Sequence, residues 1–250
     1  MNGLLQGKTA IITGTRRGIG KKICEVFAEQ GANIYACARK QNDEFELWIS
    51  ELASSNNVVI KPVYFDLADE SSIKAGLKTI FADRISIDIL VNNAGMADGS
   101  ILTMTSLSRL HEVFDVNYFA PIQMMQLVSR KMMKQKSGSI INIVSVAGLE
   151  AQPGYLSYGS SKAALIWATR SVSKELGQYG IRVNAVAPGM IKTDMGGQYK
   201  TEDELQKTID RTGLRRMGEA NEIANAVIFL ASDKASFING EILQVDGGRI

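Results

Sequence analysis

Short apolar runs rich in β-branched residues alternate along this chain with longer stretches in which apolar positions recur at helical spacing. The apolar runs predict seven strands, at 9–13, 33–38, 58–64, 87–91, 139–144, 182–187 and 241–245. The longer stretches predict helices at 19–30, 43–54, 70–83, 107–135, 156–179 and 219–231. Gly31 and Gly180 are placed to end two of these helices. Such alternation is typical of an α/β protein whose doubly wound parallel sheet is covered by helices on both faces.

The alternation continues over residues 1–250 without a Pro/Ser/Gly-rich linker or an internal repeat, which predicts one domain. One segment departs from the pattern. Residues 190–215 are polar, contain Gly196 and Gly197, and have no strand of their own. In an open α/β sheet such an insert lies at the carboxyl ends of the strands, where ligands bind. We interpret 190–215 as a substrate-binding lid; the alternative is an ordinary surface helix with flexible ends.

A glycine-rich segment lies where the first expected strand turns into the first expected helix. Its glycines follow the spacing G-x-x-x-G-x-G. Glycines at such a turn let the backbone approach the phosphates of a nucleotide at the positive end of a helix. We therefore expect a pyrophosphate site made by Gly14, Thr15, Arg16, Arg17, Gly18, Ile19 and Gly20.

The end of the second expected strand indicates which dinucleotide would bind. NAD sites usually carry an acidic residue there, which binds the ribose 2′-hydroxyl. This chain has Ala38 instead, followed by Arg39 and Lys40. Either Arg39 or Arg17 alone would be read as a solvated surface residue, but two guanidinium groups suit a 2′-phosphate. The pattern predicts NADP(H).

Tyr158 and Lys162 stand at positions i and i+4 of an expected helix, so their side chains point the same way. A free phenol has a pKa of about 10, which is high for a base at neutral pH. The ammonium group of Lys162, together with the positive charge of an oxidised nicotinamide, should lower the pKa of Tyr158. We expect Tyr158 to be the general acid/base of a reversible hydride transfer between the nicotinamide and a carbonyl carbon. The alternative is an interfacial tyrosine with a chance lysine neighbour.

Composition argues against several other classes of function. The net charge is +2 and there is no long basic run, so neither nucleic-acid nor membrane-surface binding has electrostatic support. No apolar segment reaches the roughly 18 residues of a spanning helix, and a cytoplasmic protein is expected. Cys24 and Cys37 are expected to be two buried thiols. With His111 as the only histidine, no His-based triad and no metal site are expected.

The motifs, taken in order, resemble the short-chain dehydrogenase/reductase family over essentially the whole chain. They are T-G-x-x-x-G-I-G at 13–20, N-N-A-G at 92–95, Asn117, Ser145, Y-x-x-x-K at 158–162, R-V-N at 182–184, P-G at 188–189 and V-D-G-G at 245–248. The resemblance implies a Rossmann-like sheet with the strand order 3-2-1-4-5-6-7. It also implies a homo-oligomer, usually a tetramer, built on the helices near 107–135 and 156–179 and on the last strand.

The resemblance also assigns roles to individual residues. It implies the catalytic residues Asn117, Ser145, Tyr158 and Lys162. Ser145 and Tyr158 would bind the substrate carbonyl, Lys162 would bind the nicotinamide ribose, and Asn117 would anchor a water that delivers protons to Lys162. Further cofactor contacts are expected from Asp66, Leu67, Asn93, Ala94, Gly95, Pro188, Gly189, Ile191 and Thr193. Asp66 could equally cap the next helix, and Asn117 could be an ordinary polar helix residue.

Within the family, the phrases I-N-I-V-S-V-A-G and P-G-M-I-K-T-D-M are similar to those of 3-oxoacyl-(acyl-carrier-protein) reductases. This similarity implies reduction of a ketone to a secondary alcohol, with a 3-oxoacyl thioester of fatty acid biosynthesis as one candidate. Lys136 matches one basic residue that would hold an acidic acyl carrier protein, but Tyr179 replaces the arginine expected at the second position. A sugar, a cyclic ketone or another small alcohol is the alternative substrate. A catalytically idle nucleotide-sensing protein is the alternative function.

Overall fold

A computed structural model describes residues 3–193 and 201–248. Its centre is a seven-stranded sheet in the order β3-β2-β1-β4-β5-β6-β7, and every pair of neighbouring strands is parallel. This confirms the predicted fold and strand order. The strands are β1 (Thr9–Thr13), β2 (Asn33–Ala38), β3 (Ile60–Tyr64), β4 (Ile89–Asn92), β5 (Gly138–Ile143), β6 (Ile181–Pro188) and β7 (Ile242–Val245).

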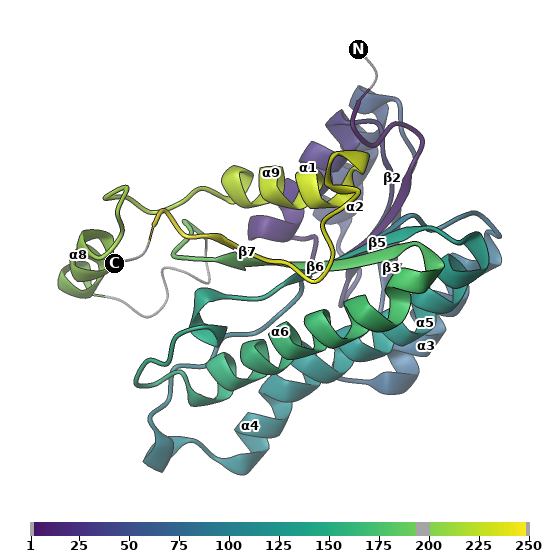
Figure 1. Ribbon diagram of the computed structural model, residues 1–250. Helices are drawn as coiled ribbons and strands as arrows, with labels where there is room; N and C mark the ends of the chain where they lie inside the picture. The colour runs from purple at the N-terminus through teal and green to yellow at the C-terminus, as the bar shows by residue number, and fades with distance from the viewer. Residues whose placement is uncertain (1–2, 194–200, 249–250) are drawn as a thin grey trace.

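Helices cover both faces of this sheet (Figure 1). One layer holds α1 (Gly18–Glu29), α2 (Asp43–Asn56) and α9 (Ala220–Ala231), and the other holds α3 (Glu70–Ala82), α4 (Leu107–Phe114), α5 (Ala120–Gln135) and α6 (Leu156–Leu176). Alternate residues of a strand point to opposite faces. Ile12 of β1 therefore packs in the core beneath α1, whereas Ile11 packs in the core beneath α5 and α6.

The strand order reverses between β1 and β4. β1 pairs with β2 on one side and with β4 on the other, and the connections from these strands leave toward opposite faces of the sheet. In open parallel sheets this reversal opens a crevice at the carboxyl ends of the strands. The crevice lies between the loop after β1 and the loop after β4, which carry the glycine-rich segment and the N-N-A-G motif.

The helix predicted at 107–135 is interrupted, and this part of the prediction is wrong. A π-helical turn, η2 (Asp115–Phe119), separates α4 from α5, and the N–H of Ala120 donates to the carbonyl of Asp115. The physical cause lies four residues beyond Asn117. In a regular helix the carbonyl of Asn117 would accept from the N–H of residue 121, but Pro121 has none.

Other boundaries differ by one to three residues. β3 and β4 begin two residues later than predicted, and a 3-10 turn, η4 (Gly177–Tyr179), follows α6. The other 3-10 turns are η1 (Leu102–Met104), η3 (Val146–Gly148) and η5 (Asp233–Ala235). Gly31 and Gly180 have φ of 83° and 71°, so both occupy the left-handed conformation that follows a helix end, as predicted.

The segment 190–215 contains one helix, α8 (Glu202–Asp210), which stands apart from both helical layers (Figure 1). Gly196 and Gly197 lie outside the described residues. At the base of this segment Ile191 and Gly218 form a parallel bridge. The N–H of Lys192 donates to the carbonyl of Gly218, and the N–H of Gly218 donates to that of Met190, both at 2.9 Å. Within the described part of the chain, no helix has the length and apolar character needed to span a membrane.

Candidate active site

The glycine-rich loop is held close to the end of β4. Gly14 has a φ of 72°, and a Cβ there would lie 2.9 Å from the Cα of Ala94. A Cβ on Gly20 would overlap the carbonyl oxygen of Gly14 and the side-chain nitrogen of Asn93. Only glycine fits both positions. The backbone therefore leaves at the start of α1 the kind of cradle that a pyrophosphate needs.

Side chains fix the two loops to each other. The hydroxyl of Thr13 accepts the N–H groups of Asn93 and Ala94, both at 3.0 Å. Asn93 Nδ2 donates to the carbonyl of Thr13 at 2.9 Å, and the hydroxyl of Thr15 donates to the carbonyl of Cys37 at 3.1 Å. The ends of β1, β2 and β4 are thus joined by direct hydrogen bonds, which hold the floor of the crevice together.

A cavity of about 830 Å³ opens at this floor. It brings together most of the residues expected from the sequence. These are Gly14, Thr15, Arg16, Arg17, Gly18, Ile19, Gly20, Arg39, Asn93, Ala94, Gly95, Ser145, Tyr158, Lys162, Pro188, Gly189, Ile191 and Thr193. Segments far apart in the sequence therefore meet around one space.

Asp66, Leu67 and Asn117 are not among the residues that line this cavity. Asp66 accepts the N–H of Ala68 at 2.9 Å, whereas the side chain that caps α3 is that of Asp69. The alternative of Asp66 as a helix cap is therefore wrong. Asn117 is completely buried behind the cavity wall.

The structure also places in the cavity residues that the sequence did not single out. They are Ala97, Asp98, Gly99, Gln152, Tyr155, Lys207, Arg211, Thr212 and Asp246, among others. They come from loops after β4, β5 and β7, from α8 and from the residues that follow α8. Asp246 belongs to the V-D-G-G motif, and Lys207, Arg211 and Thr212 belong to the segment 190–215, but no motif gives any of these residues an individual role. Their position depends on the folding of the whole chain.

Tyr158 and Lys162 project from the first turns of α6 toward the end of β5. The Nζ of Lys162 lies 5.9 Å from the centre of the Tyr158 ring and donates to the carbonyl of Ile143 at 2.9 Å. Ser145 follows β5, and its side chain hydrogen-bonds Tyr158 and accepts the N–H of Ala147 at 3.1 Å. Tyr158, Lys162 and Ser145 thus form one group on one wall of the cavity.

Burial controls the protonation of this group. It raises the pKa of Tyr158, and the hydrogen bond with Ser145 offsets only part of that effect. Burial also lowers the pKa of Lys162 to about 8. The sequence led us to expect a lowered pKa for Tyr158. The protein alone does the opposite, because desolvation of the phenolate outweighs the hydrogen bond with Ser145.

Asn117 is tied to the loop after β4 by its side chain. Its Nδ2 donates to the carbonyl of Met96 at 2.9 Å and to the hydroxyl of Ser161 at 3.1 Å, and its Oδ1 accepts the N–H of Met96 at 2.9 Å. A Cβ on Gly95 would lie 3.1 Å from Asn117 Oδ1 and 3.4 Å from Lys162 Nζ. Asn117 and Lys162 therefore meet at Gly95.

The two cysteines are buried and free, as expected. Among residues 3–193 and 201–248, no group of His, Cys, Asp and Glu side chains is arranged to hold a metal ion.

Comparison with known proteins covers almost the entire chain. A family model described as enoyl-(acyl carrier protein) reductase matches residues 14–249. A 3-oxoacyl-[acyl-carrier-protein] reductase of Vibrio harveyi is 38% identical over 244 residues, which are 98% of either chain.

Solved structures of similar proteins also match nearly the whole chain. A candidate NAD(P)-dependent gluconate 5-dehydrogenase of Beutenbergia cavernae, with NADP bound at low occupancy, has a TM-score of 0.91 and 32% identity over 97% of this chain and 96% of that chain. A candidate short-chain alcohol dehydrogenase of Sinorhizobium meliloti 1021 has a TM-score of 0.91 and 28% identity over the same shares. Because these matches run nearly from end to end, the chain belongs to the short-chain dehydrogenase/reductases, oxidoreductases that bind a nicotinamide cofactor and act on alcohol or carbonyl groups.

Proposed function

We propose that the protein is an NADP(H)-dependent reductase that converts a ketone to a secondary alcohol, with Tyr158 as general acid/base. The observation that carries this proposal is the meeting of Tyr158, Ser145 and Lys162 in the same cavity as the glycine-rich loop. The nicotinamide ring would supply or accept the hydride. The glycine cradle fits its pyrophosphate, since neither Gly14 nor Gly20 tolerates a side chain.

Arg39 and Arg17 support NADP(H) over NAD(H). Both line the cavity, together with Ala38 at the end of β2, where an NAD site usually has a carboxylate. A guanidinium group binds phosphate through two parallel hydrogen bonds. We assign Arg39 and Arg17 to the 2′-phosphate, and Asn93, Ala94, Gly95, Pro188, Gly189, Ile191 and Thr193 to the rest of the cofactor.

In the proposed reduction, the hydroxyl of Tyr158 donates its proton to the carbonyl oxygen of the substrate. Ser145 hydrogen-bonds the same oxygen and keeps it in place during the transfer. Lys162, with a pKa of about 8, is mostly cationic at neutral pH, so it stabilises the phenolate that remains. The ammonium group has further donors besides the one directed at Ile143, and we assign these to the nicotinamide ribose.

Asn117 would act on Lys162 through a water. Both donors and the acceptor of its side chain are already occupied by Met96 and Ser161. A water would therefore be held by its main-chain carbonyl, which has lost its regular helical partner because residue 121 is proline. We propose this carbonyl, and not the amide group, as the anchor.

The test is turnover of NADPH with a ketone by Tyr158→Phe, which keeps the ring and removes the hydroxyl. We expect a loss of about 100-fold or more in kcat, with NADPH binding intact. Tyr179→Phe, which removes a hydroxyl just beyond the other end of α6, is the matched control and should keep wild-type kcat with a small ketone. Wild-type turnover by Tyr158→Phe would refute the catalytic role. Binding of NADPH by the wild type without turnover of any ketone would favour the idle nucleotide-sensing protein.

The first candidate substrate is a 3-oxoacyl thioester on an acyl carrier protein, as the names of the relatives suggest. Lys136 and Tyr179 are the two positions of the carrier-binding pattern. They lie close together, because a Cβ on Gly180, the residue after Tyr179, would be 2.5 Å from the carbonyl oxygen of Lys136. Lys136 is exposed there, but Tyr179 adds no charge. Reduction of acetoacetyl thioesters should therefore depend on Lys136, and Tyr179→Arg should lower the KM for a carrier-bound substrate.

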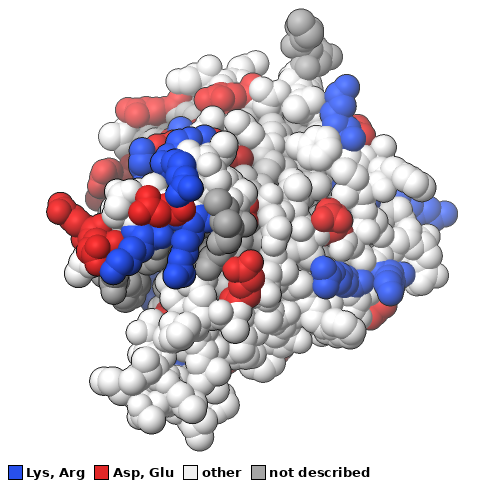
Figure 2. Space-filling model, turned by 60° about the vertical axis from the view of Figure 1, so that its left-hand side comes forward, with Lys and Arg blue, Asp and Glu red and all other residues white. Residues whose placement is uncertain are grey.

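A small hydroxy or oxo acid is the second candidate, and the cavity wall favours it. The part away from the glycine loop carries Asp98, Gln152, Lys207, Arg211 and Thr212, which are hydrogen-bonding or charged groups. Figure 2 shows Lys and Arg side chains gathered among acidic ones on the face that carries α8. An Arg and a Lys in the wall suit a carboxylate, and one structural relative is named as a candidate gluconate 5-dehydrogenase.

A panel of acetoacetyl thioesters, sugar ketones, oxo acids and cyclic ketones with NADPH would separate the two candidates. If an oxo acid is the substrate, Arg211→Ala should raise its KM about tenfold, while Arg170→Ala, on the exposed side of α6, should not. We also retain 190–215 as a substrate-binding lid of a single domain, because Lys207 of α8 lies in the cavity wall.

We propose a homotetramer for the assembly. Large apolar side chains are exposed on the elements expected to form it: Phe119 before α5 is 54% exposed, Trp167 on α6 is 74% exposed, and Phe237 before β7 is fully exposed. Exposed aromatic residues of this size are typical of interfaces. Light scattering should give four copies for the wild type and fewer for Trp167→Glu.

A further inference from the structure

Helix α6 carries a second pair of residues four positions apart, Ser157 and Ser161, each directly before a member of the Tyr158 and Lys162 pair. Successive residues of a helix point about 100° apart, so the serines occupy a neighbouring face. Both serines are buried. Two parallel rows therefore run along α6, one toward the cavity and one toward the loop after β4.

Each serine binds a partner that belongs to the β4 side of the cavity. The hydroxyl of Ser157 donates to Asp98. The hydroxyl of Ser161 accepts Asn117 Nδ2 at 3.1 Å and donates to the main-chain carbonyl of Tyr158 at 2.7 Å. Asp98 follows the N-N-A-G motif, and Asn117 holds the same loop through Met96. The serine row therefore fixes how α6 is rotated relative to the cavity.

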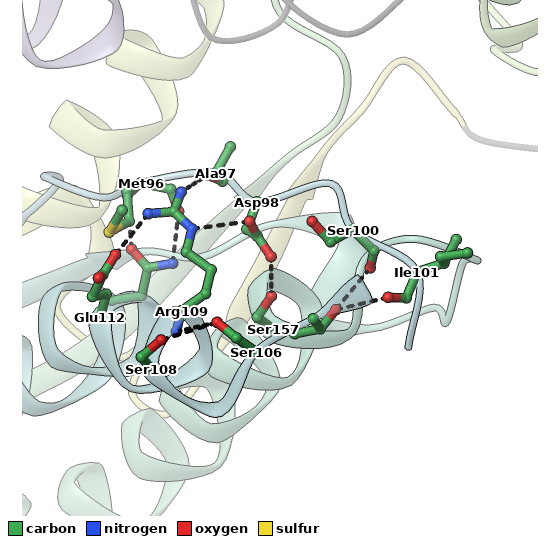
Figure 3. A network of polar contacts seen from close by, with 12 residues as sticks. Met96, Ala97, Asp98, Ser100, Ile101, Ser106, Ser108, Arg109, Glu112 and Ser157 are labelled. Atoms are coloured by element: carbon green, nitrogen blue, oxygen red, sulfur yellow. Dashed lines mark hydrogen bonds and ion pairs between the residues drawn. The ribbon is translucent and has the colours of Figure 1, made fainter. Parts of the chain in front are cut away.

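Asp98 is itself held in place by Arg109 of α4 (Figure 3). Arg109 Nε donates to Asp98 Oδ1 at 3.0 Å, while NH1 of Arg109 donates to Glu112 at 2.9 Å. Asp98 is only 8% exposed. A carboxylate so enclosed keeps one position, because each of its oxygens has a donor.

The charge of Asp98 also suits its location. Burial by itself raises the pKa of Asp98, but the hydrogen bonds from Ser157 and Arg109 outweigh it and the pKa is lowered. Asp98 is therefore ionised at neutral pH, beside the first turn of α6. That helix has no side-chain cap at Tyr155, and a negative charge at a helix N-terminus is stabilising.

We propose that Asp98, Arg109 and Ser157 are positioning residues, which set the direction of the Tyr158 side chain by fixing the first turn of α6. The proposal rests on the proposed role of Tyr158. The link is short, because Ser157 and Tyr158 share a peptide bond. Displacement of a catalytic group by about 1 Å can reduce a rate by 100-fold, so loss of this link should appear in kcat.

The test compares Ser157→Ala, Asp98→Asn and their double variant with Ser160→Ala. Ser160 is a matched control, since its hydroxyl donates to the carbonyls of Leu156 and Ser157 within α6 itself. We expect kcat to fall about tenfold or more in both single variants, with the Kd for NADPH within about twofold of wild type. The double variant should lose no more kcat than the more impaired of the two single variants, because both changes break the same link. Ser160→Ala should retain wild-type kcat.

A purely structural role predicts a different result. Activity would then fall only in proportion to the folded fraction, and NADPH binding would fall by the same proportion. This result would overturn the proposal. Wild-type kcat in Ser157→Ala would overturn it as well. A second comparison tests the route through Tyr158: Ser157→Ala should cause no further loss of kcat when it is added to Tyr158→Phe.

The outcomes separate this proposal from the proposed function. If Tyr158→Phe keeps wild-type turnover, the catalytic assignment itself is wrong. If Tyr158→Phe is inactive but Ser157→Ala and Asp98→Asn both turn over like wild type, only the positioning role is wrong. Additive losses of Ser157→Ala and Tyr158→Phe would also contradict the positioning role, because they would show that Ser157 acts independently of Tyr158.

Discussion

The Nζ of Lys162 lies 5.9 Å from the centre of the Tyr158 ring and donates its hydrogen bond to the carbonyl of Ile143. The hydrogen bond of Lys162 is therefore directed at the main chain of β5, beside the Tyr158 ring. Burial moves their pKa values in opposite directions, raising that of Tyr158 and lowering that of Lys162. Both shifts favour the neutral form of the group. The protein alone thus keeps Tyr158 as a proton donor, as a reductase requires.

The lowered pKa of Lys162 predicts how stability depends on pH. Lys162 titrates at about 8 in the folded protein and near 10.5 in the unfolded chain. Between these values the unfolded chain binds more protons, so the contribution of Lys162 to the free energy of unfolding rises with pH. The expected rise is up to about 3 kcal/mol, since one pKa unit corresponds to about 1.4 kcal/mol.

Denaturant unfolding of the wild type and of Lys162→Met, from about pH 7 to about pH 10.5, measures this rise as a change in the difference between the two proteins. Lys162→Met removes the titrating group and retains much of its volume, so the effects of Tyr158 and of the other titrating groups cancel. A difference that stays constant over this range would show that Lys162 keeps an ordinary pKa.

The cofactor preference should reverse when the charge at Arg39 is reversed. Arg39→Asp replaces a phosphate-binding group by a carboxylate that repels the 2′-phosphate and can bind a ribose hydroxyl instead. We expect the ratio of kcat/KM for NADPH to that for NADH to fall about tenfold or more. Lys40→Asp makes the same change of charge one residue further on, outside the cavity lining, and should shift the ratio much less. An unchanged ratio in Arg39→Asp would rule out Arg39 as the phosphate ligand.

Gly20 should not tolerate alanine although it lies within α1. Alanine is the better helix former by roughly 0.5–1 kcal/mol, but its Cβ would overlap the carbonyl oxygen of Gly14 and the side chain of Asn93. We expect Gly20→Ala to destabilise the protein by about 1–3 kcal/mol and to weaken NADPH binding. Gly177→Ala, whose Cβ would meet only the end of the Asn239 side chain at 3.2 Å, is the control. Equal stability of the two variants, measured by thermal unfolding, would contradict the assignment of a tight turn.

Gly95→Ala should reduce activity more than stability. The new Cβ would press on Asn117 Oδ1 and on Lys162 Nζ, which lie 3.1 and 3.4 Å from its expected place. Moving Lys162 changes its distance from Tyr158 and from the ribose that we assign to it. We expect kcat to fall about tenfold or more while the folded fraction is retained. Wild-type kcat in Gly95→Ala would show that the space at Gly95 is not needed for catalysis.

The parallel sheet was predictable from local patterns, and its strand order from the resemblance to the family. Runs such as the one ending at Thr13 alternate with helical stretches, and the parallel sheet follows from that alternation. The break at 115–119 also had a local cause, since Pro121 is visible in the sequence. The effect of Pro121 on the main-chain carbonyl of Asn117 became clear only once the helix around Asn117 was defined.

The sequence alone could predict relations between near neighbours, but it did not single out residues that reach the cavity from distant loops without a motif of their own. Tyr158 and Lys162 are one helical turn apart, so their common direction follows from helix geometry. Asp98 and Arg211 reach the cavity from separate loops, and only the folded chain brings them together. The raised pKa of Tyr158 in the protein alone was not predictable for the same reason, because burial is a property of the complete structure.

The bridge between Ile191 and Gly218 holds the two ends of the intervening chain side by side. Strand β6 ends before Ile191, and α9 begins after Gly218. The chain between these points can therefore be exchanged for that of another family member without altering any strand pairing. Because we propose this segment as the substrate-binding lid, we expect its exchange to change substrate range while Ser145, Tyr158 and Lys162 stay the same.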